Sequence, residues 1–503
     1  MRKEWDTIVV GAGVGGLTAA AKLVKEGQRV LLLDRNPHPG GTAYVYHRKG
    51  FSFPMGPLGF SHPERIKSIL NDLAVESPLH LFRVHYRIKA FGLDIPISLP
   101  SSQMVKELSA LFPPDAEGVT RFFQDVENTL LAASVPSPAI FASEYLDEFI
   151  FDQRLRRILG SLGTEEPYSN FPLLASQWNL MTKEGIWYPQ GGMGSFCDRL
   201  ARTVTGQTEK LGEIRLGVEV ANIKVEHGRA AGVRLKDGEE LSSLSVISNG
   251  DFKTTFLRLL DRDVIPPGWH KAIRLAKQTG SVLQVCLRID SNKTDLSCFH
   301  EAARIIYRRG NDIETEGTLN WSTPEVDPET LAGGELEFSL WSRDDRSLAP
   351  DGRDVIIIRV EADYSHFARY KLGWRQRTAG YGEYKSRLAR SLIREAEKLI
   401  PGLQDAIIVM DVATPLTFED QGGRTGGAVA GWSWDFGDSR DSFPRELIRT
   451  PIKNLFMAGY QAYSALFLGG IPTAMESGKR AAEAVLNRAD PTEEILLPGA
   501  ILS

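Results

Sequence analysis

The chain has 503 residues, of which 42% are hydrophobic and 24% are charged, the composition of an ordinary globular protein. Its 59 basic and 64 acidic residues give a formal net charge of −5, which is too small to predict electrostatic binding of nucleic acid. Cys197, Cys286 and Cys298 are far apart and form no Cys-x-x-Cys pair, so the sequence favours a reducing compartment and indicates neither a disulfide framework nor a zinc site.

A βαβ unit is predicted at the start of the chain. Thr7 to Val10 is a short apolar run typical of a buried strand, Leu17 to Glu26 has the pattern of a helix, and Arg29 to Leu33 that of a second strand. This order of elements is typical of a parallel sheet.

The segment between the first strand and the helix is rich in glycine. Gly11-Ala12-Gly13-Val14-Gly15-Gly16 satisfies G-x-G-x-x-G after a strand and before a helix, as the dinucleotide fingerprint requires. Gly11 permits the tight turn, Gly13 lets the backbone approach a pyrophosphate, and Gly16 allows helix and strand to pack closely. Free N–H groups at the helix start attract phosphate oxygens.

Asp34 follows the second strand at about the distance, roughly 20 residues after the glycines, at which a carboxylate accepts from ribose hydroxyls. We therefore expect an adenosine ribose beside Asp34 and Arg35. The acid argues against the 2′-phosphate of NADP, although Arg35 leaves that exclusion open. The fingerprint alone does not separate FAD from NAD, because both present the same adenosine diphosphate.

Residues 80–162 are predicted to depart from the parallel sheet. His80 to Leu99 holds three short alternating runs, which predict a small meander. Ser101 to Leu162 is mostly helical, with breaks at Pro113-Pro114 and Pro136-Ser137-Pro138. We expect these helices to form a cap over the substrate.

One segment of the cap could touch a membrane surface. Phe149-Ile150-Phe151 is followed by Arg154, Arg156 and Arg157, and apolar residues beside basic ones are enough for a peripheral contact. A buried helix with a solvated edge is the more ordinary interpretation. No apolar run approaches the roughly 18 residues that cross a bilayer, so we expect a cytoplasmic protein with at most a peripheral membrane contact.

The rest of the chain is predicted to supply strands, one long helix and a return to the first sheet. Tyr381 to Ile400 is an amphipathic helix that ends at Pro401. A last short strand, Leu455 to Ala458, precedes a helix from Pro472 to about Leu486. The other strands are predicted at Glu213 to Val220, Ile223 to Val225, Ala231 to Leu235, Leu244 to Ser248, Ser281 to Ile289, Glu335 to Trp341 and Val355 to Val360.

Two further glycine segments bear on the cofactor. They are Pro39-Gly40-Gly41-Thr42 and Gly50-Phe51-Ser52-Phe53-Pro54-Met55-Gly56-Pro57. Here the chain resembles the flavoprotein superfamily of phytoene desaturases, carotenoid isomerases and amine oxidases. The resemblance implies FAD, with the first segment passing its ribityl and pyrophosphate region and the second running beneath the flavin ring. Pro54 departs from the family, which usually has an acidic residue there.

Tyr188-Pro189-Gln190-Gly191-Gly192-Met193-Gly194 is similar to the YPxGGM segment of the phytoene desaturase and carotenoid isomerase branch. The resemblance places this segment near the entry to the flavin domain. It also implies that Val220, on the strand that follows, contacts the adenine through its backbone. A plain loop at Gly191-Gly192 is the alternative.

Two internal segments extend the resemblance. Ser248-Asn249-Gly250-Asp251 resembles the end of the strand that re-enters the flavin sheet, where a structural role is expected. Thr414 to Glu419 is similar to the link back from the substrate domain. For Trp432 and Trp434, which follow it, core packing is favoured over substrate contact.

The C-terminal block matches the family in order and spacing, from Asn454 through Gly459 and Gly469-Gly470-Ile471-Pro472 to Ser477-Gly478. The resemblance directs the helix start at the N1 and C2=O edge of the flavin, where the positive end of the helix dipole favours the charge of reduced flavin. Tyr460 stands where the family commonly has an acid that binds the ribityl chain. It could donate to ribityl or pyrophosphate oxygens, shape the substrate tunnel, or only pack.

Signatures of hydrolytic and metal chemistry are missing from the sequence. It has no Ser-His-Asp order, no HExxH and no P-loop, and its nine histidines lack metal-ligand spacing. We expect no metal. The catalytic residues are unknown from sequence, and Tyr460 and Glu419 are the candidates for handling a proton.

Together these features predict an α/β fold in which a Rossmann-like FAD-binding domain of the glutathione-reductase type is interleaved with an α+β substrate domain. The FAD-binding domain is predicted at residues 1–79, 186–260 and 445–490. The substrate and cap domain is predicted at residues 80–185 and 261–444. The predicted cofactor contacts are Gly11, Ala12, Gly13, Val14, Gly15, Gly16, Asp34, Arg35, Gly40, Gly41, Thr42, Met55, Gly56, Val220, Gly459, Tyr460, Gly470, Ile471 and Pro472.

The resemblance implies an FAD-dependent oxidoreductase that transfers hydride at flavin N5 to or from a C–C bond of a long apolar substrate, a polyene or isoprenoid. Desaturation, saturation and isomerisation all stay open. The electron acceptor is expected to be a quinone or oxygen. The alternatives are an amine oxidase and a non-catalytic carrier of prenyl lipids on the same fold.

Overall fold

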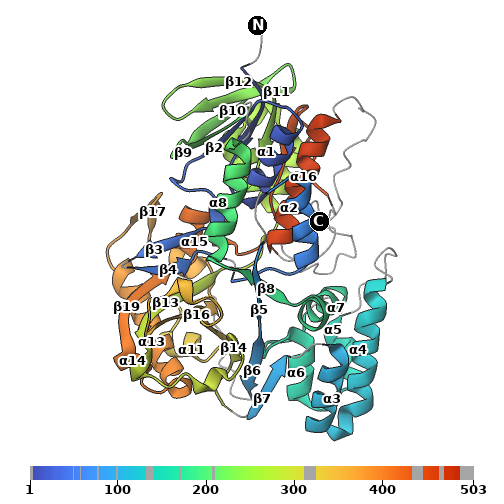
Figure 1. Cartoon of the computed structure of the whole chain (residues 1–503), viewed down its shortest axis with the longest axis vertical. Helices are drawn as coiled ribbons and strands as arrows, with labels where there is room; N and C mark the ends of the chain where they lie inside the picture. Colours follow the sequence, from blue (N-terminus) through green and yellow to red (C-terminus); the bar gives the residue numbers. More distant parts are fainter. Residues whose placement is uncertain are drawn as a thin grey trace.

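The computed structural model describes residues 4–48, 50–56, 58–75, 79–97, 100–131, 141–168, 171–206, 210–310, 324–432, 446–463 and 470–487. Within these residues, two seven-stranded sheets and a group of helices account for most of the molecule (Figure 1). Four positions singled out in the sequence lie outside the described residues: Pro57, Pro136-Ser137-Pro138, Trp434 and Gly469.

The first sheet has a core of five parallel strands. In spatial order these are β9 (Gly212–Leu216), β2 (Val30–Asp34), β1 (Trp5–Val10), β12 (Glu240–Ser248) and β20 (Leu455–Met457). Every residue of β2 is buried, as expected for a parallel strand covered on both faces. An antiparallel hairpin of β10 (Val220–Glu226) and β11 (Arg229–Leu235) joins the first half of β12.

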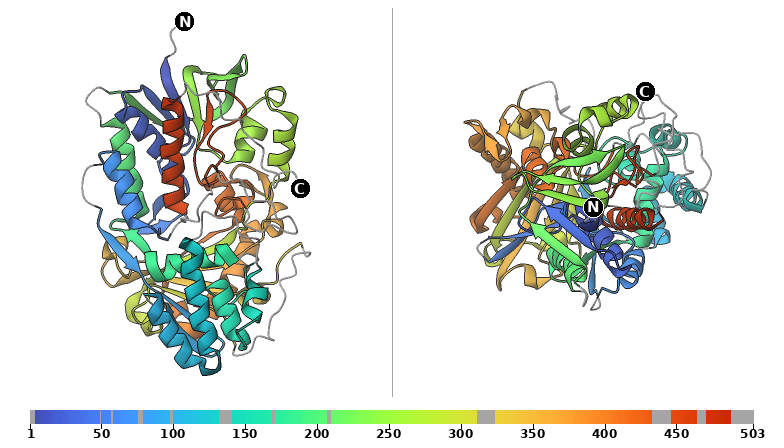
Figure 2. Two further views of the ribbon diagram at one scale, coloured as in Figure 1. Left: turned by 90° about the vertical axis from the view of Figure 1, so that its right-hand side faces the viewer. Right: turned by 90° about the horizontal axis from the view of Figure 1, so that it is seen from above.

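Helices α8 (Gly192–Thr205), α1 (Val14–Lys25) and α16 (Gly470–Leu486) pack side by side against the parallel strands (Figures 1 and 2). The central helix α1 is buried along most of its length and is rich in glycine and alanine, so its neighbours can approach closely. Helix α2 (Pro63–Asp72) contacts α16. The first and last predicted helices of the chain thus meet in one layer.

The second sheet has antiparallel neighbours except at one pair. Its order is β19 (Ile407–Ala413), β13 (Val282–Asp290), β16 (Arg353–Glu361), β15 (Leu336–Leu340), β14 (Arg304–Tyr307), β6 (Tyr86–Ala90) and β7 (Leu93–Ile97). Alternate residues of β13, β15 and β16 form one hydrophobic core with helix α13 (Tyr381–Leu399). The residues between them, which include Gln284, Glu337 and Arg359, therefore point to the opposite face.

A separate group of helices forms a third core beside β6 and β7 (Figure 1). Its helices are α3 (Ser101–Leu111), α4 (Ala116–Leu131), α5 (Ala142–Asp147), α6 (Gln153–Ser161) and α7 (Phe171–Asn179). The expectation of a mostly helical segment after residue 100 is confirmed.

In the apolar and basic segment of this group, all three arginines pair with carboxylates. Phe151 is 70% exposed, whereas Ile150 is fully buried. Arg156 pairs with Asp147 at 2.9 Å, Arg154 with the N-cap residue Asp152, and Arg157 with Glu166. No helix among the described residues has the length and apolar character needed to cross a bilayer.

Two predictions about strands are wrong. The runs between His80 and Leu99 do not form one meander, because β5 (Leu81–Val84) pairs with β8 (Ile186–Pro189) while β6 and β7 join the second sheet. Strand β6 moreover pairs in parallel with β14. The strand expected from Glu213 to Val220 is broken at Gly217, whose φ of +73° turns the chain between β9 and β10.

Close packing of α1 on α16 depends on Gly478. A Cβ atom at this position would lie 3.0 Å from Thr18 Cβ and closer still to the Gly15 carbonyl, which belongs to the backbone and has little room to move. We expect Gly478→Ala to lower the free energy of unfolding by about 1–3 kcal/mol through overpacking. Urea unfolding of the apoprotein measures the change. Gly382→Ala in α13 is the control, because a Cβ there meets nothing within 4 Å; a loss as large in the control would contradict the packing argument.

Candidate functional site

The turn after β1 brings an uncapped helix start to the surface of a cavity. Gly11 has a φ of +102°, and its amide donates to the carbonyl of Leu33 at 2.7 Å. Helix α1 follows with Gly13 at its N-cap, where no side chain accepts from the first amides. These amides and the positive end of the helix dipole are available to an anion.

Glycine is required in this turn because other backbone lies against it. A Cβ at Gly16 would collide with the carbonyl of Gly11, so the expected close packing of helix on strand is present. A Cβ at Gly13 would lie 2.7 Å from Asn249 Nδ2, and one at Gly15 would lie 2.9 Å from the amide of Gly459. The turn is thus enclosed by the ends of β12 and β20.

Asp34, at the end of β2, ties the two βα segments together. Its Oδ2 accepts from the Ala12 amide at 2.7 Å and its Oδ1 from the Asn36 amide at 2.8 Å. Burial raises the pKa of the Asp34 carboxyl above its ordinary value, and the two amides oppose that rise. Arg35, the next residue, donates to the carbonyl of Asp420 at 2.9 Å.

The second glycine segment lies directly on the first. The Gly40 amide donates to the Ala12 carbonyl at 2.7 Å, and a Cβ at Gly41 would lie 3.2 Å from Gly13 Cα. Both residues have positive φ, +107° and +55°. Thr42 then starts toward strands β3 (Val45–Arg48) and β4 (Phe51–Pro54).

The end of the chain completes this side of the site. Gly459, with a φ of +97°, follows β20, and its amide donates to Ser477 Oγ in α16 at 2.8 Å. The ring of Tyr460 lies against Gly431, where a Cβ would be 2.6 Å from Tyr460 Cδ1. Burial raises the pKa of Tyr460 to about 12, so its hydroxyl stays a neutral donor at physiological pH.

One cavity of about 690 Å³ connects these segments to the second sheet. Most of the predicted cofactor contacts line it: Gly11, Gly13, Val14, Gly15, Asp34, Arg35, Gly40, Gly41, Thr42, Gly56, Val220, Gly459, Tyr460, Gly470 and Ile471. Ala12, Gly16, Met55 and Pro472 are not among the described residues that line the cavity, although Ala12 and Gly16 shape the turn that does.

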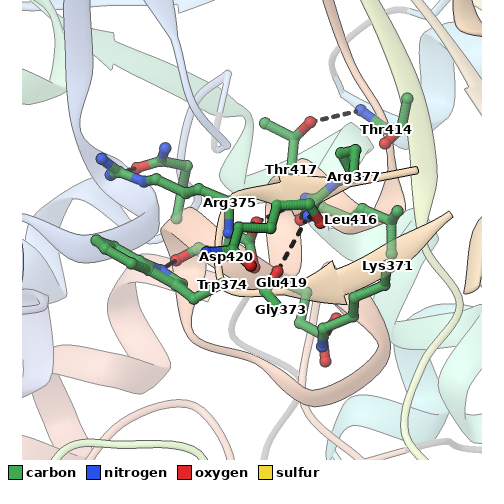
Figure 3. Close-up of polar contacts among 12 residues, drawn as sticks. Lys371, Gly373, Trp374, Arg375, Arg377, Thr414, Leu416, Thr417, Glu419 and Asp420 are labelled. Atoms are coloured by element: carbon green, nitrogen blue, oxygen red, sulfur yellow. Dashed lines mark hydrogen bonds and ion pairs between the residues drawn. The ribbon is translucent and has the colours of Figure 1, made fainter. Parts of the chain in front are cut away.

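Glu419 lies outside the cavity lining that the described residues form. It is on helix α15 (Pro415–Gly422) and binds the Lys371 ammonium at 2.6 Å and the Tyr364 hydroxyl at 2.7 Å. Its neighbour Asp420 pairs with Arg377 at 2.6 Å, on the small hairpin of β17 (Lys371–Gly373) and β18 (Gln376–Arg377) (Figure 3). These contacts hold α15 in place, and a proton-handling role for Glu419 stays a prediction.

The Tyr188 to Gly194 segment is also outside that lining. It ends β8 and starts α8, and the Gly191 amide donates to Asp345 Oδ2 at 2.6 Å. Trp432 is buried and its indole donates to the Gln461 carbonyl at 3.1 Å, which agrees with the expected core packing. Val220 does line the cavity, at the start of β10.

Apart from Asp34 and Arg35, sequence reasoning missed the charged residues that line the cavity. From the second sheet come Glu335, Glu337, Arg359 and Glu361, and from the segment after α15 comes Arg424. Isolated charges inside apolar strands, as in Leu336-Glu337-Phe338, and a single arginine between glycine pairs at 422–427 were the signals available. Asn249, expected to be structural, lines the cavity with a buried Oδ1 that accepts no hydrogen bond from the described residues.

Comparison with known proteins decides the family. The model of the flavin-containing amine oxidoreductases matches residues 14–363. The chain belongs to this family. It is therefore a flavin-dependent oxidoreductase, and the predicted α/β fold with parallel and antiparallel sheets is confirmed.

The similar proteins share low sequence identity with the chain. A prolycopene isomerase of Daucus carota is 26% identical over 91% of this chain and 75% of its own length. A lycopene-forming phytoene desaturase of Pseudescherichia vulneris is 26% identical over 95% of this chain and 99% of its own. The structure of an oxidoreductase from Methanosarcina mazei has a TM-score of 0.65 at 15% identity, covering 95% of this chain and all of the other, so it shows the shared fold.

The residues of the cavity fit a flavin dinucleotide. Backbone without Cβ atoms forms the part of its lining where Gly11, Gly13, Gly15, Gly40 and Gly41 lie close together. The Asp34 carboxylate at the end of β2 and the start of α16 belong to the same lining. A diphosphate between a ribose and a ring system needs groups of these kinds.

The Tyr460 hydroxyl is expected to donate to the bound flavin nucleotide, because it makes no hydrogen bond within the described residues and its side chain lines the cavity. We predict that Tyr460→Phe weakens flavin binding about three- to tenfold, the value of one hydrogen bond near 1 kcal/mol. Fluorescence titration of the apoprotein measures the change, which should be constant from about pH 6 to 9. Tyr463→Phe is the control, since Tyr463 is buried beside Arg480 outside the lining. Equal flavin affinities of Tyr460→Phe and Tyr463→Phe would contradict a hydrogen bond from Tyr460 to the flavin nucleotide.

Proposed function

We propose that the chain binds FAD in this cavity and transfers hydride between the flavin and a C–C bond of a long, mainly apolar substrate of the polyene or isoprenoid class. The observation that carries the proposal is the single cavity that reaches from Asp34, past the glycine segments, to the second sheet. We also propose that residues 1–79, 186–260 and 445–490 form the FAD-binding domain.

The choice of FAD is supported by the groups at each end of the cavity. The Asp34 carboxylate can accept from ribose hydroxyls while it holds the Ala12 and Asn36 amides, because each carboxylate oxygen has more than one acceptor site. The start of α16, with Gly470 and Ile471 in the lining, is suited to the electronegative edge of the ring. When bound, the flavin supplies hydride transfer at N5.

The substrate class is supported by the relatives, which are named for prolycopene and phytoene. Desaturation, saturation and isomerisation of such molecules share one requirement, a ring held beside the reacting carbons and shielded from water. Here Tyr460 and the backbone of Ala428 to Ala430 line the cavity. The electron acceptor, oxygen or a quinone, and a membrane contact at the exposed Phe151 stay predictions.

A second candidate, oxidation of an amine, is favoured by the charges on the second sheet. Glu335, Glu337 and Glu361 line the cavity there against a single guanidinium, that of Arg359. Burial raises the pKa values of Glu335 and Glu361, so their ionised forms are disfavoured until a cation arrives. Glu337 accepts from Ser339 Oγ at 3.0 Å and Glu335 from Thr164 Oγ1 at 2.8 Å. A protonated amine would offset this negative charge, whereas a hydrocarbon would not.

The cofactor proposal predicts a yellow protein whose flavin depends on the first glycine turn. Purified chain should show flavin absorption that bleaches with dithionite, and heat release followed by chromatography should identify FAD. Gly13→Val should lose the bound flavin, because its side chain fills the space beside Asn249 that the diphosphate needs. Unchanged circular dichroism of the variant is the control. A folded, colourless wild type that does not take up added FAD would overturn the proposal.

The substrate proposal predicts that the protein converts phytoene or a related isoprenoid in micelles when the flavin is supplied in its oxidised or its reduced form. It also predicts that simple primary amines do not bleach the flavin under anaerobic conditions. Glu337→Gln should then change the conversion of the isoprenoid less than about threefold. If an amine bleaches the flavin and Glu337→Gln raises the KM for that amine about tenfold or more, the second candidate holds instead.

A further inference from the structure

Arg424 is a partly buried cation that has no counter-ion among the described residues. Its guanidinium donates to the Val429 carbonyl at 2.6 Å, to the Ala428 carbonyl at 3.4 Å and to Thr42 Oγ1 at 3.4 Å. All three acceptors are neutral. No carboxylate among the described residues forms an ion pair with Arg424, and burial lowers the pKa of its guanidinium, with Tyr460 and Asp251 opposing that fall.

The other arginines of the cavity are balanced differently. Arg35 is next to the Asp34 carboxylate, and its charge opposes the rise that burial causes in the pKa of Asp34. Arg359 stands opposite Glu337 in the pairing of β15 with β16, and the charge of Glu337 opposes the fall that burial causes in the pKa of Arg359. Each therefore has a local negative charge before any ligand binds.

Asp251 is not the counter-ion of Arg424. Its carboxylate accepts from Gln278 Nε2 at 2.6 Å, from the Thr254 amide at 2.9 Å and from Thr425 Oγ1 at 2.9 Å. It is near enough to influence the pKa of Arg424 but makes no ion pair with it. A charge that is partly removed from water and held by neutral acceptors alone is costly, so an anion in the cavity would reduce that cost.

The position of Arg424 identifies which part of a ligand would supply the anion. Gly40 forms a bridge with Gly13, Gly41 lies on Gly13, and Thr42, the next residue, contacts the Arg424 guanidinium. The guanidinium is therefore beside the glycine segments where the uncapped start of α1 also lies.

We propose that Arg424 is the counter-ion of the diphosphate of the bound dinucleotide, an inference that rests on the proposed binding of FAD. A diphosphate diester carries two negative charges, and the start of α1 contributes only about half of one positive charge. One guanidinium beside the same site supplies much of the remainder, through charge-assisted hydrogen bonds that a planar guanidinium forms well with phosphate. Thr42 and the Val429 carbonyl hold that group in place before the ligand arrives.

The test compares apoprotein variants with two probes, FAD and ADP. Arg424→Met should weaken the binding of both by the same factor, about 10- to 100-fold, because both carry a diphosphate. Arg424→Lys should retain a large part of the affinity, since it keeps the charge, and thermal unfolding establishes that each variant is folded. Arg394→Met is the control, because Arg394 lies on α13, pairs with Glu329 outside the cavity lining and should leave ADP binding unchanged.

A second measurement distinguishes a contact of Arg424 with the diphosphate from a contact with the flavin ring. The midpoint potential of flavin bound to Arg424→Met should be the same as in the wild type. Unchanged ADP affinity together with a lower potential would assign Arg424 to the reduced ring and overturn the inference, as would FAD and ADP affinities within twofold of wild type in both variants. A wild type that binds ADP but not FAD would instead overturn the proposed function and leave the comparison of Arg424 variants on ADP intact.

Discussion

The site depends on how closely the backbone of α1, of α16 and of the residue after β20, together with the Asn249 side chain, approach one another at Gly15. The Cα of Gly15 faces Asn249 Oδ1 and the Gly459 amide, and its carbonyl lies against Gly478 of α16. A side chain on either glycine would separate helix α1 from α16, and with it the glycine turn from the start of α16, which line the same cavity. Backbone proximity, more than any side-chain interaction, therefore sets the shape of the site.

This constraint explains which features the sequence predicts well. Glycine spacing is local information, and the turn at Gly11, the start of α1 and the return of the chain at Gly470 follow from it without knowledge of distant contacts. Pairing between distant strands does not follow from local information. The alternating run at Tyr86 to Ala90 is compatible both with a meander and with the parallel pairing to β14 that the fold has. The break at Gly217 was missed for a similar reason, since a single glycine inside an apolar run signals either a bulge or a turn.

The residues of the second sheet that line the cavity are harder to predict than the glycine segments that line it. Glu337 and Arg359 become neighbours only when β15 pairs with β16, and their shared direction follows from a register that no local pattern specifies. Their charges also set this chain apart from the simplest expectation for a polyene site, because a hydrocarbon gives no compensation for buried carboxylates. The family shows the flavin and the fold, and the substrate stays a proposal that depends on how the second sheet lines the cavity.

Charge balance connects the two halves of the cavity. Toward the nucleotide, the start of α1 and Arg424 place positive charge where a diphosphate is expected, beside the carboxylates of Asp34, Glu219 and Asp251. Toward the second sheet, three carboxylates outnumber Arg359 among the described residues of the lining. Neither Arg424 nor these three carboxylates form an ion pair within the described residues, and such uncompensated charge costs stability. Under the proposed function, a hydrocarbon would lie along the uncharged part of the lining, which includes Val282, Val360, Phe418 and Ala428 to Ala430, and would keep its reacting carbons away from Glu335 and Glu361.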